Sequence, residues 1–266
     1  MNILDKIIAH KRVEVAQRKQ SVPVRVLEQS TFFQAQPLSM TAFINSPAKS
    51  GIIAEFKRRS PSKGDINTKV RVEDVTAGYA QAGASAISVL TDTAFFGGST
   101  EDLIAARKLN QIPILRKDFT VDEYQIIEAK SMGADTILLI AAVLQPNEVK
   151  TLVKVAHSLG LEVLLEVHNE EELHANVDAG ADLIGVNNRN LKTFELSVEV
   201  SKQLASRIPD GVVKVSESGI ESVQTIVGLR AYGYRGFLMG QNFMQREDPG
   251  QACRKFIEEL AVVQTN

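Results

Sequence analysis

The stretch IIAEFKRRSPSKG, residues 52–64, joins an apolar segment to a charged loop. Residues 52–56 combine β-branched and aromatic side chains, which is typical of a buried strand. Side chains alternate along a strand, so Ile53, Glu55 and Lys57 share one face. A carboxylate and an ammonium group at the end of an apolar strand are costly to bury unless they pair or take part in chemistry. For an isolated strand a structural ion pair is the simpler interpretation, so the rest of the chain must decide.

Downstream of this stretch the chain repeats one unit, an apolar strand followed by a polar loop and an amphipathic helix. Glycines follow several helices, at positions 83, 133, 160, 180 and 233, where a left-handed cap needs no side chain. The predicted strands span 51–56, 86–90, 112–116, 136–140, 162–167, 183–186, 212–215 and 236–239. The predicted helices span 72–81, 100–109, 122–131, 146–159, 170–178, 198–208, 222–231 and 249–263.

Eight such units favour the α/β class and a (β/α)8 TIM barrel, because the strands are apolar throughout and the units have similar lengths. A doubly wound open sheet is the alternative, and it usually has a glycine-rich dinucleotide turn after its first strand. Here residues 57–61 read KRRSP, and no G-x-G-x-x-G occurs.

The first fifty residues are expected to form a helical N-terminal extension and connector, and residues 51–266 the barrel core of a single domain. Residues 4–20 predict an amphipathic helix with Lys11 on its polar side, and residues 24–29 a shorter helix. Residues 31–50 contain two prolines and predict an extended connector. Whether the extension covers the barrel mouth or packs on its flank is left open.

In a (β/α)8 barrel the functional groups lie at the carboxyl ends of the strands. Most of the predicted strands end in ionisable or amide side chains. These are Glu55, Lys57, Lys117, Glu166, Asn187, Arg189 and Glu217. One such residue is expected in any polar loop. Seven that converge on one mouth predict an active site in which acids and bases shift each other's pKa values.

The loops after the seventh and eighth strands contain Ser218-Gly219 and Gly240-Gln241-Asn242. Glycines allow close backbone approach, and these two loops often bind phosphate in this fold. Plain turn glycines explain the same composition equally well.

Together these motifs resemble the indole-3-glycerol phosphate synthase family. The matching stretches are residues 53–64, 88–92, 96–99, 113–119, 164–168, 184–191, 216–220 and 236–240. One departure is Gln241, where many family members carry a small polar residue after the glycine. A backbone contact to phosphate survives this change, whereas a hydroxyl contact does not.

The resemblance implies ring closure, decarboxylation and dehydration of 1-(2-carboxyphenylamino)-1-deoxyribulose 5-phosphate, giving indole-3-glycerol phosphate, with neither metal nor organic cofactor. It implies Lys117 as general acid, Glu166 as base, Lys57 as a second acid, and Glu55, Asn187 and Glu217 as further catalytic residues. It further implies substrate binding by Ser60, Arg189, Phe96 and Phe119, and phosphate binding by Ser218, Gly219, Gly240 and Gln241. His168 lies beside this set, and its role is left open.

Composition sets the remaining expectations. The 266 residues are 44% hydrophobic and 23% charged, with a net charge of −2, so no basic field indicates nucleic acid. A single cysteine, Cys253, excludes an internal disulfide. No apolar run has the length of a membrane span, and no secretory signal begins the chain. We expect a cytoplasmic monomer that binds a phosphorylated small molecule.

Two other functions remain compatible with the sequence. A phosphosugar aldolase would use Lys117 as a Schiff-base nucleophile. A catalytically silent barrel would serve as a scaffold for partners, although it would have no need of the acids and bases at its rim.

Overall fold

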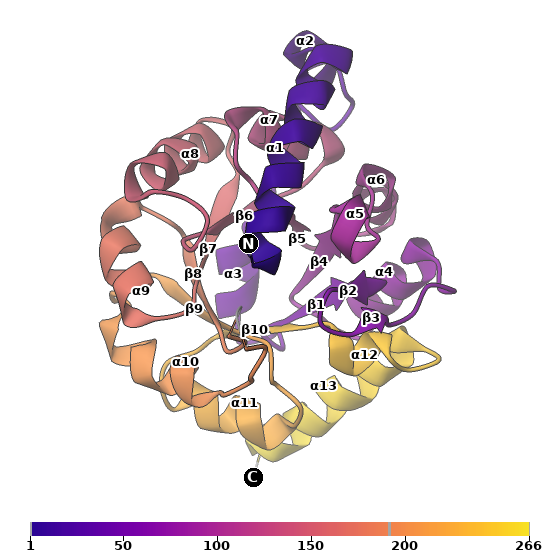
Figure 1. The fold of residues 1–266 in the computed structure, drawn as a ribbon. Helices are drawn as coiled ribbons and strands as arrows, with labels where there is room; N and C mark the ends of the chain where they lie inside the picture. Colours follow the sequence, from indigo (N-terminus) through magenta and orange to yellow (C-terminus); the bar gives the residue numbers. More distant parts are fainter. Residues whose placement is uncertain (1, 191–192, 266) are drawn as a thin grey trace.

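The computed structural model describes residues 2–190 and 193–265, and within them eight parallel strands close into a barrel (Figure 1). The barrel strands are β1 (Ile52–Phe56), β4 (Ala86–Leu90), β5 (Ile114–Lys117), β6 (Thr136–Ile140), β7 (Glu162–Val167), β8 (Leu183–Asn187), β9 (Val213–Glu217) and β10 (Gly236–Met239). Closure brings the last strand beside the first, so that Ile53 lies opposite Ala86 on one side and Leu238 on the other. The predicted (β/α)8 fold is confirmed.

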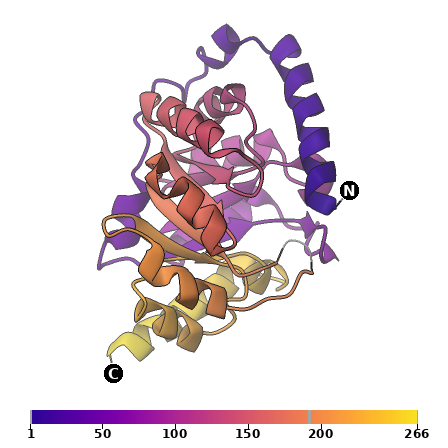
Figure 2. The same cartoon turned by 60° about the vertical axis from the view of Figure 1, so that its left-hand side comes forward.

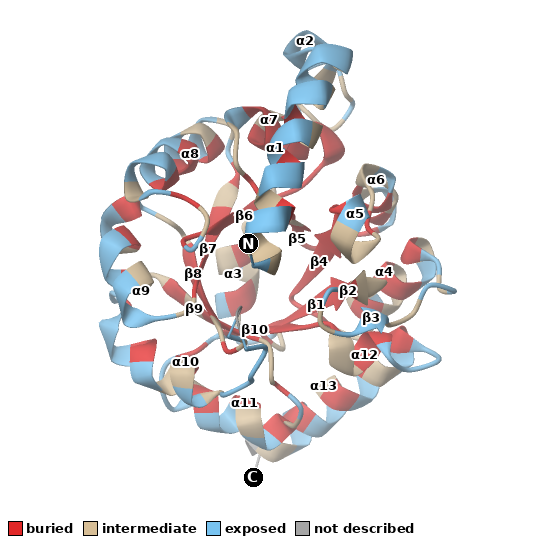
Figure 3. Ribbon diagram, in the orientation of Figure 1, coloured by how far each residue is buried: buried red, intermediate tan, exposed pale blue. Residues whose placement is uncertain are grey.

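An outer ring of helices surrounds the strands and leaves its outward face in solvent, as Figure 3 shows. Its members are α4 (Val72–Gln81), α6 (Thr100–Leu109), α7 (Glu123–Met132), α8 (Pro146–Ser158), α9 (Glu170–Asn176), α10 (Glu199–Leu204), α11 (Val223–Arg230) and α13 (Pro249–Thr265). Short 3-10 turns, η1 (Val177–Ala179) and η2 (Ala205–Arg207), extend α9 and α10. Side chains of Ser99, Asp122, Asn169 and Ser222 cap helix starts, which satisfies N–H groups that have no partner inside the helix.

Four short elements at the carboxyl end of the barrel were not predicted. They are β2 (Arg59–Ser60), β3 (Gly64–Asp65), α5 (Thr93–Phe96) and α12 (Gln241–Met244). β2 and β3 pair with each other and fold the basic loop after β1 into a small hairpin. The predicted strands at 112–116 and 212–215 end too early, since Lys117 and Glu217 belong to β5 and β9. Leu191, the end of the motif at 184–191, lies outside the described residues.

The N-terminal extension covers both ends of the barrel, and Figures 1 and 2 show it crossing from one end to the other. It contains α1 (Ile3–Ser21), α2 (Val24–Leu27) and α3 (Met40–Asn45). The prediction of an extended connector at 31–50 is wrong, because Ser39 caps α3 and directs Met40 and Ile44 into the inner core of the barrel. The Thr41 N–H and the Ser39 hydroxyl both donate to Glu162 at the start of β7, at 2.9 and 2.6 Å. α3 therefore closes the amino end.

The helix α1 lies over the carboxyl end and is held there by a buried cation. Lys11 is 1% exposed, and its Nζ lies 3.0 Å from Asp92, 3.0 Å from Asp118 and 2.9 Å from Glu14. The prediction that Lys11 belongs to a solvated face is wrong. Burial favours the neutral amine, but these carboxylates outweigh it and raise the pKa of Lys11 above its usual value.

Among the described residues, no helix combines the length and apolar character that crossing a membrane requires.

Candidate active site

A cavity of about 690 Å³ opens at the carboxyl end of the barrel. All eight barrel strands contribute to its wall, and Ile3, Leu4 and Ile7 of α1 form its roof. Every residue that the sequence assigned to substrate lines this cavity. These are Glu55, Lys57, Ser60, Phe96, Lys117, Phe119, Glu166, Asn187, Arg189, Glu217, Ser218, Gly219, Gly240 and Gln241. The predicted convergence on one mouth is therefore observed.

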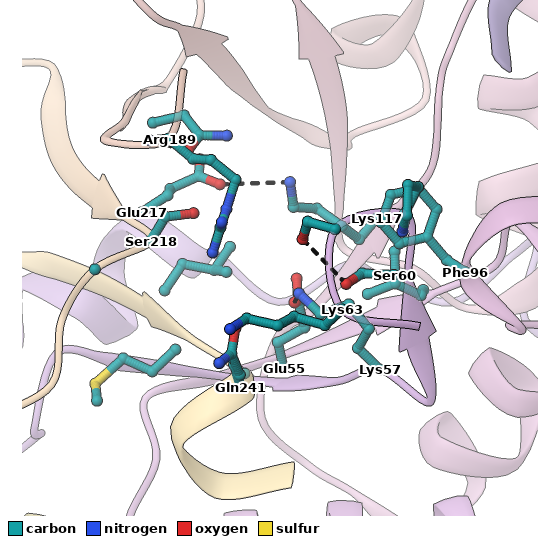
Figure 4. A pocket seen from close by; sticks show the side chains of 18 of the residues that line it. Glu55, Lys57, Ser60, Lys63, Phe96, Lys117, Arg189, Glu217, Ser218 and Gln241 are labelled. Atoms are coloured by element: carbon teal, nitrogen blue, oxygen red, sulfur yellow. Dashed lines mark hydrogen bonds and ion pairs between the residues drawn. The ribbon is translucent and has the colours of Figure 1, made fainter. Parts of the chain in front are cut away.

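At the centre Lys117 lies between two carboxylates that come from β7 and β9. Its Nζ donates to Glu166 Oε2 at 2.9 Å and lies 3.4 Å from Glu217 Oε2, and Figure 4 shows Lys117 facing Glu217 across the cavity. Burial favours the neutral amine, but Glu166 and Glu217 overcome it and raise the pKa of Lys117 well above its usual value. The group therefore stays protonated at physiological pH.

The same environment separates the pKa values of the two carboxyl groups. Burial raises the pKa of Glu217 to about 7, and repulsion from Glu166 adds to this, while Lys117 opposes it. Burial acts on Glu166 in the same direction, but Lys117 and His168 overcome it and hold its pKa well below the usual value. Near neutral pH Glu166 is thus an anion, whereas Glu217 exchanges a proton. Such separation is how acid and base roles arise in one site.

A second ion pair joins Lys57 to Glu55, with Nζ 2.7 Å from Oε1. The shared face expected from strand alternation is therefore confirmed. Ser88 Oγ lies 3.4 Å from the other oxygen of Glu55 and donates a weak hydrogen bond. A methyl group at Gly240 would lie 2.7 Å from Glu55 Oε1, so only glycine leaves room for this carboxylate.

The turn after β9 is built in an unusual conformation. Ser218 has φ +66° and Gly219 has φ +71°, and a side chain in the left-handed region is strained unless its surroundings hold it there. The amide of Asn188 donates to the Ser218 carbonyl at 3.0 Å and to Ser216 Oγ at 3.0 Å. Asn188 therefore fixes a turn that lines the cavity together with Gly240 and Gln241 of the loop after the neighbouring strand β10.

An apolar wall stands opposite these polar loops. The rings of Phe96 and Phe119 lie 5.8 Å apart with a tilt of 41°, which is a favourable arrangement for an aromatic pair. Leu138 and Ile140 of β6 continue this surface deeper in the cavity. The cavity thus has a charged half and an apolar half, as an amphiphilic aromatic ligand requires.

Comparison with known proteins indicates one family. A profile described as "Indole-3-glycerol phosphate synthase" matches residues 4–256. An indole-3-glycerol phosphate synthase of Bacteroides thetaiotaomicron is 48% identical over 97% of this chain and 99% of its own length. Another, of Carboxydothermus hydrogenoformans, is 44% identical over 94% of this chain and 97% of its own. The chain belongs to the indole-3-glycerol phosphate synthase family.

Membership in the family confirms the activity that the sequence predicted, a carboxy-lyase of tryptophan biosynthesis acting on a phosphorylated small molecule. Solved structures give the fold alone. A mandelate oxidase matches with a TM-score of 0.60 at 16% identity, over 80% of this chain and 71% of its own. KGPDC from Streptococcus mutans matches with a TM-score of 0.60 at 15% identity, over 80% of this chain and 97% of its own.

Two residues of the cavity wall, Lys63 and Arg246, were not predicted from the sequence. Lys63 lies within the hairpin loop after β1, and Arg246 follows α12. Lys63 belongs to the motif at 52–64, so the sequence contained an indication of its role. No motif or spacing around Arg246 indicates a role for that residue. His168 was noted without a role, and it lies 3.2 Å from Glu166.

Proposed function

We propose that Lys117 protonates the ketone oxygen of 1-(2-carboxyphenylamino)-1-deoxyribulose 5-phosphate as the aromatic ring attacks. In this step a carbon–carbon bond forms, and the carbonyl electron pair moves to oxygen. The side chain of Lys117 is 15% exposed, and its ammonium group projects into the cavity between two carboxylates. Although its pKa is raised, an alkoxide is a far stronger base than an amine, so transfer to the developing alkoxide is downhill. This position of Lys117 is the observation that carries the proposal.

Glu166 is the base of the final step in this proposal. After carbon dioxide leaves with its bonding electrons returned to the ring, the nitrogen lone pair expels the hydroxyl group as water. Lys57 supplies the proton for that departure, and Glu166 then removes a proton from the methylene carbon beside nitrogen. Over the whole reaction the substrate accepts two protons and loses one, so one proton is taken up from solvent. Once Lys117 has given up its charge, the pKa of Glu166 rises, and it becomes a stronger base.

The remaining predicted residues bind the substrate. Lys57 and Arg189 face the carboxylate and phosphate charges, Arg189 with a guanidinium fork suited to oxyanions. Asn187 and Glu217 contact hydroxyl groups, Glu55 orients Lys57, and Ser60 contributes its hydroxyl. The phosphate lies against the backbone of Ser218-Gly219 and Gly240-Gln241. The rings of Phe96 and Phe119 hold the aromatic amine in the apolar half, where a leaving carboxylate is poorly solvated.

Turnover of the synthetic substrate, followed by the near-ultraviolet absorbance of the indole product, tests the proposal. Lys117→Met should abolish most of the signal, and treatment with borohydride should trap no covalent adduct. An adduct at Lys117 would instead indicate a Schiff-base aldolase, and absence of turnover by the unmodified chain would favour a scaffold.

We also propose that residues 1–266 act as one catalytic domain, monomeric and resident in a reducing cytoplasm. Cys253 is fully buried, and burial raises the pKa of its thiol to about 12, so it is suited to packing rather than to redox chemistry. Light scattering at micromolar concentration tests the monomer, and a mass near twice 29.1 kDa would contradict it.

A further inference from the structure

His168 lies between two carboxylates at the rim of the barrel. Its Nε2 is 3.2 Å from Glu166 Oε1, and its Nδ1 is 3.1 Å from Glu172 Oε2. The ring is 10% exposed. A neutral imidazole has one N–H and can serve only one of two flanking carboxylates, whereas an imidazolium serves both. The position of His168 therefore favours the protonated imidazolium form of its ring.

The ring is fixed by the helix that follows it. Glu172 is the third residue of α9, and its Oε2 accepts the backbone N–H of His168 at 2.9 Å as well as facing Nδ1. Its Oε1 accepts from the Asn169 side chain at 3.0 Å, while Asn169 caps α9 by accepting the Glu172 N–H at 2.8 Å. This capping arrangement anchors His168 so that Nε2 points back to β7 and the catalytic cavity.

The two oxygens of Glu166 have different neighbours. Oε1 accepts from the Asn187 amide at 3.1 Å and also faces His168 Nε2. Oε2 accepts from Lys117 at 2.9 Å. His168 Nε2 has no hydrogen-bond partner, so its contact with Oε1 is an ion pair. This ion pair and the Asn187 hydrogen bond restrict rotation of the carboxylate and leave Oε2 as the oxygen that shares its surroundings with Lys117.

We propose that His168 is a positioning residue, whose imidazolium clamps Glu166 Oε1 so that Oε2 receives the proton of the substrate. This inference rests on the proposed role of Glu166 as base. It adds a chain of contacts from α9 through Glu172 and His168 to the reacting carboxylate. His168 itself does not touch the substrate in this account.

The electrostatics agree with that geometry. Burial opposes the charge, but Glu166 and Glu172 overcome it and raise the pKa of His168 to about 10. In turn His168 and Lys117 hold the pKa of Glu166 low. The other groups that face Glu166 are the neutral amide of Asn187 on β8 and, beyond Lys117, Glu217 on β9. Loss of the imidazolium should therefore raise the pKa of Glu166, while Lys117 remains to counter the rise.

The direct test is an NMR titration of the Glu166 carboxyl carbon in protein labelled with 13C at glutamate, with the signal assigned by its loss in Glu166→Gln. The titration extends below pH 4.5, because the unmodified protein should protonate Glu166 only well below that value. In His168→Asn the midpoint should rise by about one pH unit or more, and the acid limb of kcat/KM should move in the same direction. His174→Asn, a change at an exposed position on α9, is the matched control and should leave both unchanged.

A double-mutant comparison separates this role from simple packing. Glu172→Gln should raise the Glu166 midpoint less than His168→Asn does, and the double variant should match His168→Asn alone, because Glu172 acts through the ring. A Glu166 midpoint unchanged in His168→Asn, with the fold intact by circular dichroism, overturns the inference. If the midpoint moves but Glu166→Gln keeps full kcat, the electrostatic link stands and the base assignment fails instead.

Discussion

Lys11→Met is the sharpest test of how α1 is held over the cavity. Methionine keeps the length and apolar stem of lysine but removes the ammonium group from Asp92, Asp118 and Glu14. Asp92 and Asp118 have side chains that are 0% and 1% exposed. Asp118 keeps Arg116 at 3.3 Å and the Thr91 hydroxyl at 2.6 Å, whereas Asp92 Oδ2 has no hydrogen-bond partner and loses its ion-pair partner.

Removal of one member of a buried ion pair costs about 3–5 kcal/mol, because the partner charge is left uncompensated. For a chain of this size that corresponds to a fall in Tm of about 6–20 °C. Lys19→Met is the matched control on the same helix, since Lys19 pairs with Asp122 at 2.7 Å but its side chain is 46% exposed. An exposed pair contributes less than about 1 kcal/mol.

The assay is denaturant unfolding of both variants at pH 7, together with the double variant Lys11→Met/Asp92→Asn. Asparagine keeps the cap of α5, where Asp92 Oδ1 accepts the N–H groups of Phe95 and Phe96, but it carries no charge, so part of the lost stability should return. A Lys11→Met variant that is no less stable than Lys19→Met would refute this account of α1.

The pH dependence of stability provides a second test of the ion pairs made by Lys11. Burial opposes ionisation of Asp118, but Lys11 and Arg116 overcome it and lower its pKa from 3.8 to about 2. Its contribution is therefore complete above about pH 4 and is lost as the pH falls through about 2. Lys11 has a raised pKa, so its contribution is complete below its ordinary value of 10.5 and is lost above its raised value. In Lys11→Met the pKa of Asp118 rises, and acid unfolding should begin at a higher pH.

Two further predictions concern the cavity, and a third concerns the loop that follows β4. Lys117→Met should lower kcat at least about a hundredfold while circular dichroism shows an intact fold, and near-normal turnover would exclude Lys117 as the acid. In Glu217→Gln the pH profile of kcat should lose an inflection near pH 7, because the group with a pKa of about 7 is gone; an inflection that persists would belong to another residue. Gly98→Ala should destabilise the protein by about 1–3 kcal/mol, since the added carbon would lie 2.0 Å from the Leu90 carbonyl oxygen, and calorimetry would show an unchanged Tm if that loop adjusts freely.

The positions of the proposed catalytic side chains were predictable because they follow from strand alternation. Glu55 and Lys57 share a face for any straight strand, and parallel strands of a closed barrel end at one rim. The ends of β5 and β9 were harder to predict, because Lys117 and Glu217 look like loop residues by polarity. They extend the strands because Lys117 pairs with Leu90 of β4 and Glu217 pairs with Asn187 of β8 in the barrel, and no local pattern encodes those partners.

Contacts made across long distances in sequence were not predictable. Lys11 looks like a surface residue within its helix, and only the positions of Asp92 and Asp118, contributed by other parts of the chain, reveal it as buried. The helix α3 was missed because Pro37 and Pro47 flank a segment with weak periodicity, and its stability comes from packing inside the barrel. The sequence indicated nothing about His168 beyond its place after a strand, because its proposed role depends on contacts with both Glu166 and Glu172.

The helix α3 also determines the order in which the chain can fold. Met40 and Ile44 leave the ribosome before any barrel strand, yet their inner-core partners include Val213 and Val215 of β9 and Leu238 of β10. During synthesis at about 5–20 residues per second, this segment must wait while roughly two hundred residues emerge. Its docking is therefore among the last events of folding, and pulse-labelled hydrogen exchange during refolding should find its backbone amides protected after those of the central strands.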